Sequence, residues 1–140
     1  MHSAQRHNII VRAPVTHHTH RLHRQEYRER LHLADLYLDT YPYNAGSTAR
    51  DVMDAHLPMV TLSGRTSVSR MAGSMLHAAG VGELVTHSHA DYEALVVALA
   101  HDPDRIAALK QTLEQRSATW HQAPARLIAS LEQALLARLQ

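Results

Sequence analysis

Short apolar stretches of strand length alternate with stretches of helical periodicity along this chain, and that alternation constrains the fold more than any other feature. Runs typical of strands occupy residues 8–13, 34–40, 57–63 and 82–88. Apolar residues recur at helical spacing in the other segments, which predicts helices over 24–33, 48–56, 66–79 and 88–100, from 103 and from 124. Strands that alternate with helices in this order form a parallel sheet covered by helices on both faces. The sequence therefore predicts an α/β half-domain.

Two local signals refine this assignment. In the strand predicted at 34–40, Leu36 and Leu38 share one face, and Tyr37 and Asp39 share the other. Gly80 follows the helix predicted at 66–79, at the position where a left-handed residue commonly ends a helix.

The composition bounds the class of protein. A chain of 140 residues with 45% apolar content is sufficient for one compact domain or one lobe of a larger protein. The formal net charge of +1 argues against binding to nucleic acid or to an anionic membrane through a field of the whole chain. The chain has no cysteine and no run long enough to span a membrane, so we expect a soluble, cytoplasmic protein with no membrane or nucleic-acid partner.

Four of the 13 histidines fall within "HHTHRLH", residues 17–23. His17, His18 and His20 have a spacing that a loop can fold around a zinc ion. No cysteine or carboxylate pattern accompanies them, and histidine tracts of this kind are often solvated loops. We therefore predict no functional metal site.

The stretch "YNAGSTARD", residues 43–51, follows a predicted strand and begins a helix. Ligands of α/β sheets bind at this position, and the amides and hydroxyls of Ser47 and Thr48 can hold a diphosphate, with Asp51 accepting from a ribose diol. The same residues also fit an ordinary helix cap, in which Ser47 or Thr48 caps and Asp51 closes the capping box. The spacing leaves both interpretations open.

Four arginines are candidates for contact with a bound phosphate. Arg28 and Arg30 precede the second predicted strand, where either can reach a phosphate with a bidentate fork. The alternative for these two is a solvated helix face on which neighbouring glutamates pair with them. Arg65 and Arg70 leave the same choice open.

Five short motifs follow one another along the chain, namely "ADLYLDT", "PYN", "ST..D", "P.VTL.G" and "SR.A.S.L". Taken in order, they resemble the C-terminal lobe of the O-linked N-acetylglucosamine transferases, glycosyltransferase family 41, which includes the SPINDLY-type enzymes. The resemblance covers residues 21–110 and is of the bacterial type. It implies the C-terminal half of a GT-B glycosyltransferase, a Rossmann-like parallel sheet with flanking helices that binds a nucleotide sugar.

The resemblance also implies roles for individual residues. Ser47 and Thr48 take the place of the Thr pair that contacts the donor diphosphate, and Asp51 matches the aspartate that holds the ribose. Gly46 stands where the family usually has a histidine beside the uracil.

Upstream, Arg30 maps to the basic residue that contacts phosphate, and Tyr27 falls where some bacterial members also have tyrosine. Arg65 reverses the charge of the family's Gly-Glu-Thr motif. No catalytic residue is assigned.

We expect three parts: an N-terminal strand and His-rich loop at 1–23, a donor-binding lobe at 24–118 and an amphipathic helix at 119–140. The resemblance implies transfer of N-acetylglucosamine from UDP-N-acetylglucosamine, or a related nucleotide sugar, to Ser or Thr of an acceptor protein, with no cofactor and no metal. Because the family's acceptor lobe precedes the matched region, we expect a truncated lobe that is inactive alone and lacks an N-terminal lobe.

The alternative function is a catalytically inactive fragment that acts as an oligomerisation or protein-interaction module. On this interpretation Leu131, Leu135 and Leu139 are partly exposed and drive self-association.

Overall fold

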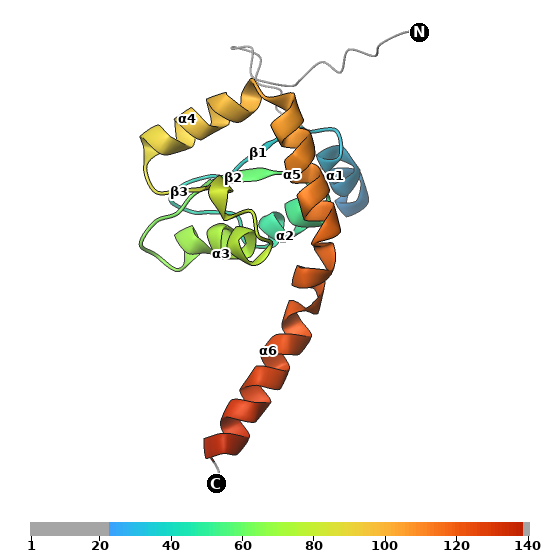
Figure 1. Ribbon diagram of the computed structural model, residues 1–140, viewed down its shortest axis with the longest axis vertical. Helices are drawn as coiled ribbons and strands as arrows, with labels where there is room; N and C mark the ends of the chain where they lie inside the picture. Colours follow the sequence, from blue (N-terminus) through green and yellow to red (C-terminus); the bar gives the residue numbers. More distant parts are fainter. Residues whose placement is uncertain (1–22, 139–140) are drawn as a thin grey trace.

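The computed structural model describes residues 23–138 (Figure 1). The strand predicted at 8–13 and His17, His18 and His20 lie outside the described residues. The elements, in chain order, are α1 (Arg24–Leu31), β1 (Tyr37–Leu38), α2 (Ser47–Asp54), β2 (Met59–Leu62), the 3₁₀ turn η1 (Val68–Arg70), α3 (Met71–Ala78), η2 (Gly82–Leu84), β3 (Val85–Thr86), α4 (His89–Ala100), α5 (Pro103–Gln115) and α6 (Ser117–Arg138).

Within these residues, three parallel strands form one sheet in the order β1-β2-β3. Tyr37 pairs with Met59, and Thr61 pairs with Val85, so the carboxyl ends of the strands meet at one edge. The strands lie between α4 on one side and α2 and α3 on the other (Figure 1). The predicted α/β fold with a helix-covered parallel sheet is confirmed.

Local sequence signals fix several helix ends. The side chain of Ser88 accepts from the backbone N–H of Asp91 at 3.1 Å and caps α4. Asp102 caps α5 in the same way, with Pro103 in the first turn, where its missing N–H costs nothing. Gly80 has φ +75° and follows α3, as predicted, and a Cβ there would meet the Arg116 guanidinium.

Two helices differ from the prediction. The segment 66–79 begins as the 3₁₀ turn η1 and becomes α-helical only at Met71. The last helix begins at Ser117, seven residues before the predicted start at 124. Its first turn is held by Trp120, which is buried and donates its indole N–H to Asp54 at 3.2 Å. This tertiary contact, which periodicity does not report, explains the earlier start.

The core lies between the sheet and its helices, and α6 continues beyond it (Figure 1). The fully buried large apolar side chains are Met53, Leu57, Met59, Leu76, Leu84, Leu99 and Leu113. Five apolar side chains in the projecting part of α6 are more than half exposed, namely Leu127, Ile128, Leu131, Leu135 and Leu136. The exposure predicted for Leu131 and Leu135 is confirmed, and Leu139 lies outside the described residues. Among residues 23–138 no helix has the length and apolar character needed to cross a membrane.

Candidate functional site

A buried carboxylate organises the loop that follows β1. Asp39 is 6% exposed, and its Oδ1 accepts from the backbone N–H groups of Thr40 at 2.9 Å and Ala45 at 2.8 Å. Its Oδ2 accepts from Asn44 Nδ2 at 3.0 Å and from the Thr61 hydroxyl at 2.6 Å. Within the described residues Asp39 forms no ion pair, so these hydrogen bonds are what offsets the cost of burying its charge. The loop of residues 40–46 is thereby attached to the sheet.

The sequence analysis placed Asp39 on the face opposite Leu36 and Leu38, without assigning which of the two faces is buried. Leu38 is 42% exposed, whereas Asp39 is buried. An acidic side chain with enough hydrogen-bond donors around it can take such an interior position.

Asn44 connects the same loop to β2. Its Nδ2 donates to the Leu62 carbonyl at 2.9 Å as well as to Thr61 and Asp39. These acceptors fix the orientation of the amide, because a flipped amide would turn Oδ1 toward a carboxylate and a carbonyl. Asn44 is 1% exposed, and its Oδ1 has no hydrogen-bond partner among the described residues.

The loop and α2 enclose a cleft of about 380 Å³ at the carboxyl edge of the sheet. Its wall combines hydroxyls and backbone amides with aromatic and apolar side chains. The lining residues are Tyr37, Thr40, Tyr43, Asn44, Ala45, Gly46, Ser47, Thr48, Val68 and Met71. Ligands of open α/β sheets bind at this edge, so the cleft is the candidate site.

The N-terminus of α2 opens into this cleft without a side-chain cap. Gly46 is the N-cap residue, and no side chain of the described residues accepts from the first-turn amides. The capping alternative for Ser47 and Thr48 is therefore wrong. Asp51 closes no capping box either, because its Oδ1 accepts from Arg28 Nε at 3.1 Å and Nη2 at 2.8 Å. The uncapped amides carry the positive end of the helix dipole.

Beside the cleft, α1 and α2 bring four of the predicted residues together around Tyr27. Burial, followed by the negative charge of Asp51, raises the pKa of Tyr27 above its usual 10.0, and Arg30 and a hydrogen bond with Thr48 act in the opposite direction. The Arg30 guanidinium lies 5.8 Å from the centre of the Tyr27 ring, in a cation–π contact. The phenol is therefore neutral at physiological pH and can donate a hydrogen bond.

The six predicted site residues fall into two adjoining groups. Gly46, Ser47 and Thr48 line the cleft, whereas Tyr27, Arg30 and Asp51 lie in the cluster beside it. Thr48 belongs to both groups, because it lines the cleft and bonds to Tyr27.

Among the described residues, Arg28 is not paired with a neighbouring glutamate, as the solvated-face alternative would require. Arg28 binds Asp51, 23 residues away. Glu26 accepts instead from the backbone N–H of the N-cap residue, and Glu29 accepts from a glutamine one turn earlier. This helix face is thus tied to α2.

Sequence reasoning gave no individual role to several other lining residues of the cleft. Tyr43 and Asn44 lie in the candidate stretch 43–51, Tyr37 comes from a strand that was assigned only as structure, and Val68 and Met71 come from the next βα connection. Asn44 carried a usable signal, since it is a polar residue in the turn between a predicted strand and a predicted helix. The contribution of Val68 and Met71 depends on packing between distant segments and has no local signal.

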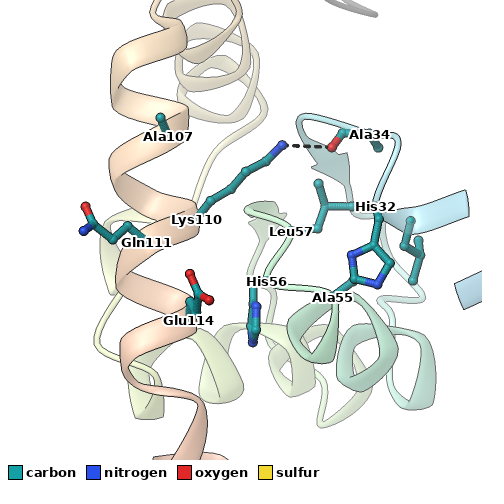
Figure 2. Close-up of a pocket in the computed structure, with 10 residues that line it drawn as sticks. His32, Ala34, Ala55, His56, Leu57, Ala107, Lys110, Gln111 and Glu114 are labelled. Atoms are coloured by element: carbon teal, nitrogen blue, oxygen red, sulfur yellow. Dashed lines mark hydrogen bonds between the residues drawn. The ribbon is translucent and has the colours of Figure 1, made fainter. Parts of the chain in front are cut away.

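A second cavity lies at the opposite, amino edge of the sheet, between α1, α2 and α5 (Figure 2). It measures about 340 Å³, and Figure 2 shows Lys110 reaching across it from α5. The ammonium group donates to the Ala34 carbonyl at 3.1 Å and to Asp35 at 3.0 Å. His56, on its wall, has φ 52°, the left-handed conformation that ends α2. Because its lysine is already engaged and it lies away from the carboxyl edge, this cavity is a weaker candidate.

A metal site requires ligand side chains that converge on one point. Among residues 23–138, no group of three His, Asp or Glu side chains is arranged to hold a metal ion.

Comparisons with known proteins agree on one family. A model of glycosyl transferase family 41 matches residues 4–123. The chain is 37% identical over 87 residues to the UDP-N-acetylglucosamine--peptide N-acetylglucosaminyltransferase of Caenorhabditis elegans, covering 62% of this chain and 8% of that protein. It is 36% identical over 91 residues to the probable UDP-N-acetylglucosamine--peptide N-acetylglucosaminyltransferase SEC of Arabidopsis thaliana, covering 64% of this chain and 9% of that protein.

A solved mutant O-GlcNAc transferase from Thermobaculum terrenum superimposes with a TM-score of 0.75 at 27% identity, over 81% of this chain and 22% of that one. The chain thus spans less than a tenth of these two curated relatives.

Proposed function

The chain belongs to glycosyltransferase family 41, and we propose on that basis that it is the donor-binding lobe of an enzyme that transfers N-acetylglucosamine from UDP-N-acetylglucosamine to serine or threonine of proteins. The observation that carries the proposal is the cleft at the carboxyl edge of the sheet, into which the uncapped N-terminus of α2 opens. Clefts at this edge of open α/β sheets are common ligand sites, which supports a nucleotide sugar as the ligand here.

The diphosphate would be held by backbone N–H groups at the start of α2 and by the hydroxyls of Ser47 and Thr48. These donors are fixed before the ligand arrives, because Asp39 and Asn44 attach the preceding loop to the sheet. During transfer the bond between the sugar C1 and the phosphate oxygen breaks, a bond from C1 to the acceptor hydroxyl oxygen forms, and that hydroxyl releases its proton to solvent or to the departing phosphate. Negative charge then grows on the departing UDP, where prearranged donors are most effective.

The nucleoside is proposed to lie on the neighbouring cluster. The ribose hydroxyls would donate to the Asp51 carboxylate, which Arg28 holds in place. Arg30 and the neutral phenol of Tyr27 would contact the phosphates from the side of α1. Gly46 offers no side chain to stack on the base, and the Met71 methyl group lies 3.2 Å from where a Cβ at Gly46 would stand. We propose no metal and no cofactor in this arrangement.

The test is isothermal titration of the chain with UDP and with UDP-N-acetylglucosamine. Thr48→Val removes the hydroxyl at nearly constant volume and is expected to weaken binding by roughly tenfold or more, as for one hydrogen bond to a charged group. Thr112→Val is the matched control, because Thr112 bonds only to the Ala108 carbonyl of its own helix among the described residues.

Asp51→Asn provides the second arm. It removes the charge that Arg28 balances and is expected to weaken UDP more than inorganic diphosphate, because only UDP has a ribose. Asp35→Asn, another partly exposed and ion-paired aspartate, is its control. Saturable UDP binding that resists both Thr48→Val and Asp51→Asn would contradict the proposal.

A second candidate function, an interaction module, is favoured by the exposed apolar side chains of α6. Leu131 is 54% exposed and Leu135 is 65% exposed, on a helix that projects from the core. Sedimentation velocity over a range of concentrations tests this candidate, since self-association that Leu135→Glu abolishes supports it and a monomer at every concentration contradicts it.

A further inference from the structure

The carboxyl edge of the sheet holds another cavity, separate from the proposed diphosphate cleft. It measures about 330 Å³ and lies where β2 and β3 end and α4 begins. Its lining residues are Tyr41, Leu62, Ser63, Gly64, Arg65, His87, Ser88 and His89. None of these belongs to the residues that line the cleft beside α2.

The wall that carries Arg65 is held in one conformation by hydrogen bonds. Ser69 is 2% exposed, and its hydroxyl accepts from the backbone N–H of Thr66 at 3.1 Å and bonds to the Thr66 carbonyl at 2.9 Å. Gly64 N–H donates to the Ser69 carbonyl at 3.2 Å. A Cβ at Gly64 would approach the Ser69 hydroxyl to 2.7 Å and the Tyr41 ring to 3.0 Å, so the turn requires glycine. The cavity is therefore formed in the absence of a ligand.

The opposite wall is formed by the start of α4. His89 is the first residue of this helix, and its ring lies edge-on to Tyr41 with 5.5 Å between ring centres. Ser88 caps only the N–H of Asp91, so the amides before it have no intrahelical partner. The Asp91 carboxylate accepts from the Ser88 hydroxyl at 2.6 Å and does not line the cavity.

The charge lining this cavity has one sign. Arg65 forms no ion pair or hydrogen bond within residues 23–138, and the lining contains no carboxylate. Two imidazoles, His87 and His89, add N–H donors, and Ser63 adds a hydroxyl. A guanidinium fork with several N–H donors and a helix N-terminus suits a tetrahedral oxyanion.

We propose that this cavity binds a phosphate group, with Arg65 as the bidentate donor and His87 and His89 as flanking donors. Inorganic phosphate and a phosphate monoester present the same chemistry to these groups. The inference does not depend on the donor-binding proposal, because the two cavities share no lining residue.

The experiment is a titration of the isotopically labelled chain with inorganic phosphate, followed by NMR at constant pH and ionic strength. The imidazole signals of His87 and His89 and the Arg65 Nε–H signal are expected to shift together and to saturate. Arg65→Gln is expected to weaken this binding by about tenfold. Arg70→Gln, which removes an exposed arginine five residues along that lines neither cavity, is expected to leave it unchanged.

Each of the other possible results either overturns the phosphate-site proposal or identifies the source of the phosphate. Shifts that rise without saturation into tens of millimolar, or that saturate at the same phosphate concentration in Arg65→Gln as in the unaltered chain, show an adventitious ion only and overturn the proposal. Shifts confined to the amides of Ser47 and Thr48 place phosphate in the other cleft and also overturn it. If glucose 6-phosphate saturates the His87 signal at lower concentration than inorganic phosphate does, the site takes a phosphate monoester. The reverse order identifies free phosphate.

Discussion

Replacing Asp39 tests whether its buried carboxylate holds the candidate site together. In Asp39→Ala, the buried N–H of Ala45 loses its acceptor, at a cost of about 1–3 kcal/mol. The Thr61 hydroxyl also loses its acceptor, which costs about 1 kcal/mol more. Asn44 keeps its bonds to Leu62 and Thr61, so it adds little. The expected loss in the free energy of unfolding is about 3 kcal/mol.

The assay is urea denaturation. With a slope of about 2 kcal/mol/M, a loss of about 3 kcal/mol lowers the midpoint by about 1.5 M. Asp39→Asn keeps Oδ1 for the two backbone donors and is expected to cost about 1–2 kcal/mol. Asp35→Ala is the control, because its ion pair with Lys110 is about one-third exposed and is worth less than about 1 kcal/mol. A midpoint for Asp39→Ala no lower than that of Asp35→Ala would refute the reasoning.

Three further predictions concern α2, Tyr27 and α6. His56→Gly is expected to raise the free energy of unfolding by about 0.5–1 kcal/mol, because His56 has a left-handed backbone that glycine adopts without strain. Gly80 occupies the same position after α3, so Gly80→Ala is expected to lower the free energy of unfolding by more than about 1 kcal/mol. Thermal or urea unfolding measures both changes. Burial and then the Asp51 charge raise the pKa of Tyr27, so Asp51→Asn is expected to lower this pKa, measured by NMR of labelled tyrosine, and an unchanged value would contradict the contribution of Asp51. Because the shift is upward, its contribution to stability is complete below the normal pKa of 10.0 and is lost as the pH rises through the pKa of the folded protein. Leu131→Glu is expected to change the unfolding free energy by less than about 0.5 kcal/mol, since the side chain is 54% exposed, and a larger loss would show that it packs within the monomer.

Periodicity and turn chemistry predicted the sheet class because these signals are local. The strands observed at Tyr37–Leu38, Met59–Leu62 and Val85–Thr86 fall inside the predicted runs. The length of each strand could not be predicted, because it depends on which residues of the neighbouring strand are in position to form hydrogen bonds. The start of α6 was missed for a similar reason, because Trp120 anchors it through a contact with Asp54, 66 residues away.

The candidate site shows the same division. The stretch containing Ser47 and Thr48 could be identified as a strand-to-helix turn, and its place at the carboxyl edge followed from the parallel sheet. Which residue pairs with Asp51 could not be predicted, because Arg28 reaches it only when α1 packs beside α2.

The sequence by itself determined the order of the elements, the parallel sheet, the family and the loop on which the candidate site is built, because periodicity, turn residues and motif order are properties of neighbouring positions. Only the tertiary structure decided that Asp39 is buried, that α2 has no side-chain cap and that Arg65 meets His87 and His89 in one cavity. Those features depend on hydrogen bonds, packing and charges contributed by segments that are distant in the chain and are brought together only by folding.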